Sequence, residues 1–120
     1  MKKNKISKKI LIVEDDEDFL SILKIKFTAE GFSVVTAKNG EEGISVAEVE
    51  KPDLIISDIL MPIMNGVDMA GKIKESNKNA QILFLTNTQD AGYAKGFDYL
   101  IKANLRINEI VEKVKIKLGV

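Results

Sequence analysis

Short apolar runs alternate along this chain with segments of helical periodicity, and this alternation limits the folds open to it. The runs have the length of strands and are nearly continuous in their apolar character, as buried parallel strands are. They cover residues 10–13, 32–37, 54–57, 82–85 and 99–101. Strands that alternate with helices are typical of a parallel sheet with helices on both faces. We therefore expect one α/β domain that uses essentially the whole chain.

The helical segments follow the strands in turn. Phe19, Leu23 and Phe27 stand at a spacing of four before Gly31, which is the pattern of an amphipathic helix with a C-terminal glycine. Further helices are expected over residues 41–50, 67–76 and 107–118. Residues 89–96 hold two glycines and few apolar side chains. Here we expect one or two helical turns at most, or an irregular loop.

The charges are unevenly distributed although the formal net charge is zero. Five of the 18 basic residues precede the first strand, so the rest carries 13 basic and 18 acidic side chains, a net of −5. An acidic body argues against direct nucleic-acid binding, which needs a basic face. We expect residues 1–8 to form a solvated basic tail and residues 9–120 to form the domain. No apolar stretch has the length of a signal peptide or a membrane span, so we expect a cytoplasmic protein without membrane contact.

The chain contains no cysteine and no histidine. This excludes disulfides and the usual ligands of zinc, copper and haem. Any bound metal must therefore be held by oxygen atoms, which favours magnesium, calcium or manganese. Phosphate chemistry, if present, would need a carboxylate as the carrier.

Charged residues stand where three of the predicted strands stop. Glu14 and Asp15 follow the first strand, Asp58 follows the third, and Lys102 follows the last. The carboxyl ends of parallel strands open onto one crevice, where such folds bind ligands. Carboxylates gathered there repel each other unless a cation joins them. The acids at 16–18 are explained by a helix N-terminus, but Glu14 and Asp15 precede it and suggest a magnesium site beside a reactive aspartate.

Four motifs in this order resemble the receiver domain of two-component response regulators. They are residues 10–16 (ILIVEDD), 56–66 (ISDILMPIMNG), 83–86 (LFLT) and 98–102 (DYLIK). The resemblance covers residues 10–118. It implies a flavodoxin-like, doubly wound, five-stranded parallel sheet in the order 2-1-3-4-5, with the fourth helix shortened or irregular in this chain.

The resemblance also implies roles for individual residues. Asp58 would be the phosphoacceptor, and Lys102 would pair with the acyl phosphate. Glu14 and Asp15 would bind Mg²⁺ together with Asp58, and Leu60 would add its backbone carbonyl.

Two further residues would make up the switch. Thr86 would bind a phosphoryl oxygen, and Tyr99 would be the aromatic side chain that turns inward on activation. The expected partners are a sensor histidine kinase or histidine phosphotransfer protein and a downstream protein. The chain would be a monomer or a weak phosphorylation-dependent dimer, and it would be no enzyme beyond promoting its own phosphorylation and dephosphorylation.

The sequence departs from the family pattern at two places. Lys102 is followed by Ala103 rather than by the proline common in the family, where this bond is often cis. A cis bond costs about 2.5–4 kcal/mol without proline, so either the bond is trans with a rearranged loop or the fold holds it cis; we expect cis. Only 13 positions separate Thr86 from Tyr99, fewer than is usual in the family, and the missing residues fall in the fourth helix. In the family this helix, the fifth strand and the fifth helix form the usual signalling face, so signalling through that face is in question for this chain.

The same fold also supports other functions. A phosphorylation-independent protein-interaction module is the principal alternative. A flavodoxin needs a hydroxyl- and glycine-rich loop after the first strand, where this chain has acids. A haloacid-dehalogenase-type phosphatase needs a second aspartate two positions after the nucleophile, where this chain has Leu60.

Overall fold

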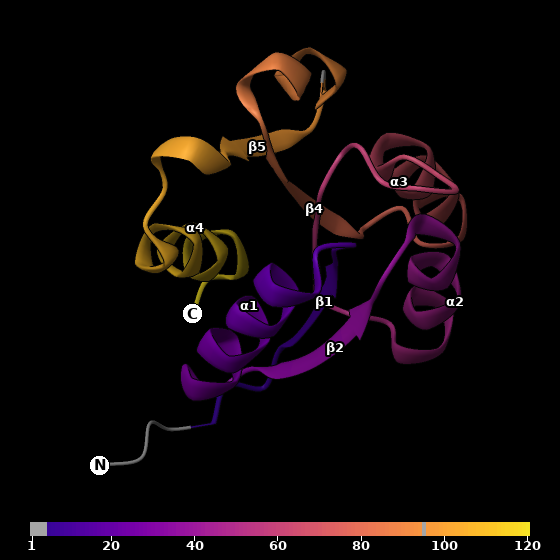
Figure 1. Ribbon diagram of the computed structural model, residues 1–120. Helices are drawn as coiled ribbons and strands as arrows, with labels where there is room; N and C mark the ends of the chain where they lie inside the picture. The colour runs from indigo at the N-terminus through magenta and orange to yellow at the C-terminus, as the bar shows by residue number, and fades with distance from the viewer. Residues whose placement is uncertain (1–4, 95) are drawn as a thin grey trace.

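The computed structural model describes residues 5–94 and 96–120 and contains a five-stranded parallel sheet (Figure 1). The strands are β1 (Lys9–Val13), β2 (Ser33–Ala37), β3 (Leu54–Ser57), β4 (Gln81–Thr86) and β5 (Asp98–Ile101). Their order in the sheet is β2-β1-β3-β4-β5. This order confirms the expected flavodoxin-like topology.

Among the described residues, three of the four α-helices begin with a side-chain cap. The helices are α1 (Glu17–Ala29), α2 (Gly40–Glu50), α3 (Gly66–Ser76) and α4 (Ile107–Leu118). The side chains of Asp16, Asn39 and Asn65 accept hydrogen bonds from backbone N–H groups in the first turns of α1, α2 and α3. These caps satisfy N–H groups that a helix leaves without partners, so each helix starts at a defined residue above the sheet edge.

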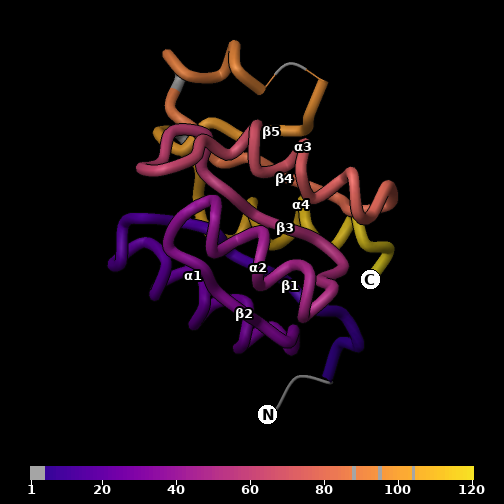
Figure 2. Tube along the Cα trace, turned by 90° about the vertical axis from the view of Figure 1, so that its right-hand side faces the viewer, coloured from indigo at the N-terminus to yellow at the C-terminus, as the bar shows by residue number. Residues whose placement is uncertain are grey.

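The two faces of the sheet are covered by different helices, as Figures 1 and 2 show. Successive side chains of a strand point to opposite faces. Ile10 and Ile12 accordingly pack in a cluster with α1 and α4, whereas Leu11 and Val13 pack in a second cluster with α2 and α3. The burial of these strands on both faces explains their continuous apolar sequence.

The register of the strands brings their acidic ends together. Val13 of β1 pairs with Ser57 of β3, so the residues that follow them, Glu14 and Asp58, leave the sheet side by side. The backbone N–H of Asp58 donates to the carbonyl of Val13 at 3.3 Å. Farther along the edge, Thr86 pairs with Ile101, the residue before Lys102.

The segment between β4 and β5 is a short 3-10 helix, η1 (Thr88–Ala94). This confirms the expected shortening of the fourth helix of the family pattern; the label α4 belongs here to the closing helix. A second 3-10 helix, η2 (Lys102–Asn104), follows β5. The expectation of a cis Lys102–Ala103 bond is wrong: every peptide bond among the described residues is trans. The chain passes from β5 straight into a 3-10 turn there, which a trans bond accommodates without the cost of a cis bond.

The described part of the chain contains no helix both long and apolar enough to cross a membrane. Residues 1–4 of the predicted basic tail lie outside the described residues. Within the rest of that tail, the backbone N–H of Ile6 donates to the carbonyl of Gly31 at 2.9 Å, and its side chain packs against the cluster under α1.

Candidate functional site

The site lies at the carboxyl edge of the sheet, where β1, β3 and β5 end. Glu14 is buried, with an exposed fraction of 3%, whereas Asp15 is exposed. Asp58 is half-buried at the end of β3. Lys102 reaches the same place from the first turn of η2. The structure therefore brings together four of the residues expected from the sequence.

Lys102 joins the two carboxylates. Its ammonium nitrogen lies 2.8 Å from Oδ2 of Asp58 and 2.9 Å from Oε1 of Glu14. Both distances are those of charge-assisted hydrogen bonds. These contacts link three strands that are far apart in the sequence, and they place a positive charge directly beside the Asp58 carboxylate.

Burial and this ion pair set the charges of the site. Burial raises the pKa of Glu14, and the negative charge of Asp58 adds to that rise against the opposing effect of Lys102. For Lys102, burial alone would lower the pKa, but the hydrogen bonds and charges of Asp58 and Glu14 outweigh it and raise the pKa above its ordinary value. Lys102 therefore keeps its positive charge throughout the neutral range.

The three carboxylates can also converge on one ion. One oxygen from each of Glu14, Asp15 and Asp58 lies within 4.8 Å of the others. When all groups are ionised, three negative charges and the one positive charge of Lys102 leave a net of −2. Carboxylate oxygens are the ligands that Mg²⁺, Ca²⁺ and Mn²⁺ prefer. The donor set and its charge thus fit a divalent cation.

Backbone and small side chains hold the Asp58 turn in place. The N–H of Ile59 donates to Oδ1 of Asp58 at 2.7 Å, and the hydroxyl of Ser57 donates to the Asp58 backbone carbonyl at 2.7 Å. Gly66, at the start of α3, passes so close that an added Cβ would lie 2.2 Å from the same carbonyl and 2.8 Å from the Phe84 ring. Only glycine fits here, because real Cβ atoms do not approach backbone oxygen so closely.

Thr86 ends β4 with its side chain completely buried. Its hydroxyl oxygen finds no hydrogen-bond partner among the described residues. A buried hydroxyl without a partner costs free energy. Within the described residues, the hydrogen-bonding capacity of this hydroxyl at the carboxyl end of β4 is therefore unused.

Leu60 and Tyr99, the other two residues expected at the site, are both substantially exposed. The exposed fractions are 51% for Leu60, in the loop after Asp58, and 44% for Tyr99, on β5. In the same loop Ile63 has a φ of 74°, a left-handed conformation that a β-branched residue rarely adopts. This loop is therefore an exposed and locally strained border of the site.

Phe19 is a site residue that the periodicity placed only on the core face of a helix. The Lys102 ammonium lies over its ring, 5.0 Å from the centroid. A cation at this distance over an aromatic face is attracted by the ring quadrupole. The position of Phe19 just after the acidic run was a visible signal, but spacing alone does not tell which way a ring faces.

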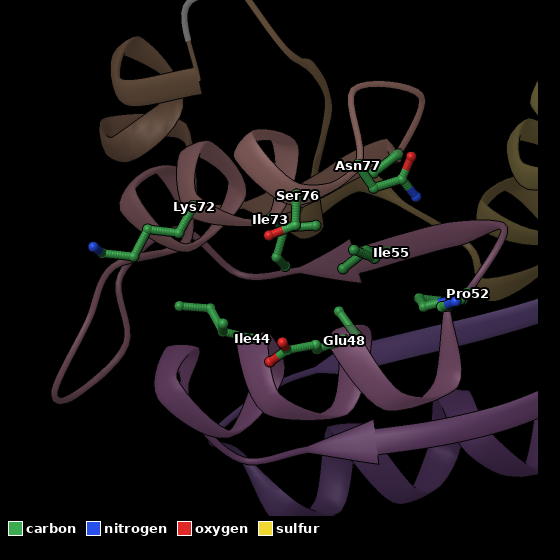
Figure 3. A pocket seen from close by; sticks show the side chains of 11 residues that line it. Ile44, Glu48, Pro52, Ile55, Lys72, Ile73, Ser76 and Asn77 are labelled. Atoms are coloured by element: carbon green, nitrogen blue, oxygen red, sulfur yellow. The ribbon is translucent and has the colours of Figure 1, made fainter.

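A pocket of about 490 Å³ lies elsewhere, between α2, α3 and the amino-terminal end of β3 (Figure 3). Ile55 and Ile73 lie among its apolar lining, and Glu48 and Lys72 bring charge to it. Its lining includes neither Lys102 nor any of the three clustered carboxylates. The chemistry of the carboxylates and the lysine therefore does not involve this pocket.

Comparisons with known proteins agree with this geometry. The family model described as the response regulator receiver domain matches residues 10–115. The chain is 32% identical to the alkaline phosphatase synthesis transcriptional regulatory protein PhoP of Bacillus subtilis, over 92% of this chain and 51% of that protein. The chain thus spans about half the length of this relative.

Solved structures are similar over nearly the whole chain. The response regulator protein TrrA of Thermotoga maritima, in complex with Mg²⁺-BeF, has a TM-score of 0.81 and 33% identity, covering 90% of this chain and 96% of that one. A CheY-like response regulator receiver domain protein of Methanospirillum hungatei has a TM-score of 0.84 and 28% identity, covering 93% and 94%. The likeness therefore extends to both sequence and fold.

Proposed function

The chain belongs to the response regulator receiver domain family, and from this premise we propose that it accepts a phosphoryl group on Asp58 from a phosphohistidine. The donor would be a sensor histidine kinase or a histidine phosphotransfer protein. The observation that carries the proposal is the placement of the Lys102 ammonium 2.8 Å from the Asp58 carboxylate, within one cluster with Glu14 and Asp15. The protein would be a signalling module rather than an enzyme acting on a separate substrate.

In the transfer step Asp58 acts as the nucleophile. One carboxylate oxygen attacks the phosphorus, an O–P bond forms and the N–P bond of phosphohistidine breaks. The electron pair of that bond stays on the imidazole nitrogen, which takes up a proton. Phosphoryl transfer depends mainly on positioning and on neutralising charge. Lys102 supplies a compact positive charge at the acceptor, and its raised pKa keeps that charge in place.

Mg²⁺ would be held by Glu14, Asp15 and Asp58 and by the backbone carbonyl of Leu60. When bound, it would neutralise negative charge on the phosphoryl oxygens. The net charge of −2 and the oxygen-only donor set support this assignment. Glu14 is buried and Asp15 is exposed, so the set would combine a buried and an exposed carboxylate.

Thr86 and Tyr99 would convert phosphorylation into a change of shape. The hydroxyl of Thr86 is buried without a partner among the described residues and could donate to a phosphoryl oxygen. Tyr99 is exposed, and it would be the side chain that turns inward. A phosphoryl group that binds one arrangement of these side chains better than the other would shift their populations. A downstream protein, or a second copy of the chain in a weak dimer, would bind the favoured arrangement. We place this signalling in the cytoplasm.

The test is labelling of the full chain by acetyl phosphate with Mg²⁺. We expect intact-mass spectrometry to show one added phosphoryl group, absent without Mg²⁺ and absent in Asp58→Asn. Reduction by borohydride, which converts an aspartyl phosphate to homoserine, should place the group on residue 58. Asp98→Asn is the matched control, because Asp98 lies on β5 away from the carboxylate cluster, and it should be labelled like the wild type. A folded wild type that takes no phosphoryl group would instead favour a phosphorylation-independent interaction module.

A further inference from the structure

Lys102 reaches the site from the least buried strand of the sheet. All four residues of β3 are buried, whereas Asp98 and Tyr99 of β5 are exposed and Leu100 and Ile101 are only half-buried. The strand that precedes Lys102 therefore fixes its ammonium less firmly than β1 and β3 fix the carboxylates. The position of the ammonium must depend on the contacts of the side chain itself.

The contacts of that ammonium within the described residues are of two kinds. Two are ion pairs, with Glu14 and with Asp58, at 2.9 and 2.8 Å. The third is the face of the Phe19 ring, at 5.0 Å from the centroid. On the proposed function, Glu14 and Asp58 are also the groups that hold the divalent cation. The Phe19 ring has no oxygen atom to offer a metal, so a bound cation would not compete with Lys102 for this contact.

Phe19 is itself well anchored. It lies in the first turn of α1, and its backbone N–H donates to the capping carboxylate of Asp16 at 3.2 Å. Its ring is partly buried against the cluster of Ile10, Ile12 and Leu23. A ring held in this way presents its negative face in a fixed place, and the attraction to a cation strengthens where water is excluded.

From these contacts we propose that Phe19 is a positioning residue for Lys102: its ring face holds the ammonium at the acceptor when the carboxylates are shared with a divalent cation. This inference rests on the proposed function for its consequence, since a displaced Lys102 would slow phosphoryl transfer to Asp58. The contact between the Phe19 ring and the Lys102 ammonium is seen in the structure and does not depend on the proposed function. The two parts can therefore be tested separately.

The first test uses the metal-free protein and needs no phosphorylation. Aromatic ring currents should shift the methylene protons next to the Lys102 ammonium upfield in a ¹H–¹³C NMR spectrum. We expect this shift to be lost in Phe19→Leu and retained in Phe19→Tyr. An unchanged Lys102 signal in a folded Phe19→Leu protein would overturn the proposal, whatever the outcome of the labelling experiment.

The second test changes the charge distribution of the ring and keeps its shape. Pentafluorophenylalanine at position 19 reverses the ring quadrupole, and we expect labelling by acetyl phosphate to slow about 5-fold, as in Phe19→Leu, while Phe19→Tyr stays near the wild-type rate. The control is the same fluorinated residue in place of the buried Phe32, whose ring contacts the Phe27 ring edge-on. There the rate should not change.

The labelling results separate the possible roles of the ring. A fluorinated residue 19 that is labelled at the wild-type rate, with Phe19→Leu slowed, would show a purely steric role and overturn the proposal. Equal slowing by fluorination at positions 19 and 32 would also overturn it, because the effect would then be one on packing. A wild type that is not labelled at all would refute the proposed function and the consequence drawn for transfer, while the NMR measurement would still decide the contact.

Discussion

The carboxylates and the lysine of this site are held by differently packed parts of the sheet. Glu14 and Asp58 follow β1 and β3, whose residues, apart from Lys9, are buried. Lys102 follows β5, which is half-exposed and is preceded by the seven-residue 3-10 helix η1 in place of a full helix. The carboxylates are thus fixed by the core, and the lysine is fixed mainly by its own contacts. A receiver domain can therefore shorten the segment before β5 and still bring Lys102 to Glu14 and Asp58.

Core truncation should show the largest difference between the two regions. Ile56 on β3 is 1% exposed, whereas Leu100 on β5 is half-buried. We expect Ile56→Ala to lower the free energy of unfolding by about 4 kcal/mol and Leu100→Ala by about 1.5 kcal/mol. Urea denaturation followed by circular dichroism measures both. Equal losses would show that β5 is as firmly packed as β3.

Two glycines offer the same comparison at the backbone. A Cβ at Gly66 would lie 2.2 Å from the Asp58 carbonyl, whereas a Cβ at Gly92 in η1 would meet nothing within 4 Å. Gly66→Ala should destabilise the fold by about 3 kcal/mol through overpacking. Gly92→Ala should stabilise it by about 0.5 kcal/mol by reducing the freedom of the unfolded chain. Thermal unfolding of the two variants side by side is the measurement, and a stable Gly66→Ala protein would contradict the tight packing described around Asp58.

Thr86 ends β4, which lies between β3 and β5 in the sheet. We expect its hydroxyl to lower the stability of the fold and to strengthen the binding of a phosphoryl-like group. Its buried hydroxyl has no partner among the described residues, so Thr86→Val should raise the free energy of unfolding by about 1 kcal/mol. The same change should weaken Mg²⁺-dependent beryllofluoride binding about tenfold, because the variant cannot donate a hydrogen bond to the bound group. Thr28→Val, at an exposed position in the last turn of α1, is the control and should leave that binding unchanged. A Thr86→Val protein that binds as tightly as the wild type would exclude Thr86 from the site.

The smallest expected effect is the response of the two regions to acid. The ion pair with Lys117 holds the pKa of Asp98 on β5 below its ordinary value, so its contribution to stability is present above about pH 4 and is lost as the pH falls through the lower folded-state value. Because Asp98 is exposed, the loss should stay below about 0.5 kcal/mol.

Glu14 should respond with the opposite sign. Burial raises its pKa, so the folded state holds the proton more tightly than the unfolded chain does. Its contribution to stability therefore decreases as the pH rises from about 4.3 through the higher folded-state value. Carboxyl ¹³C NMR titrations should place the Glu14 midpoint above, and the Asp98 midpoint below, their ordinary values. Midpoints displaced in the same direction would contradict the contrast between a buried site and an exposed edge.

Much of the fold could be predicted because buried parallel strands leave continuous apolar runs. The β3 strand was predicted at residues 54–57 and lies at Leu54–Ser57. Glu14, Asp15, Asp58 and Lys102 could be predicted to meet, since the carboxyl ends of parallel strands share one edge. The shortened segment could be predicted as well, from its glycines and its length.

Side-chain direction and local backbone geometry could not be predicted from apolar runs and residue spacing. The periodicity of α1 placed Phe19 on its apolar face, but only the structure shows the ring beneath the Lys102 ammonium. The missing proline after Lys102 left both isomers of the next bond open, and the expected cis form was wrong because β5 runs directly into η2 through a trans bond. Such features depend on how neighbouring elements pack, which residue spacing does not encode.

The most direct test of the acceptor site is ¹⁹F NMR of the wild-type protein with beryllofluoride, with and without Mg²⁺. Beryllofluoride attached to a carboxylate imitates its phosphoryl group, so it reports the site without a kinase. We predict bound fluoride resonances that appear only when Mg²⁺ is present and that are absent from Asp58→Asn. A folded wild type that gives no bound resonance with Mg²⁺, or an Asp58→Asn protein that gives the same resonances, would contradict the assignment of Asp58 as the acceptor.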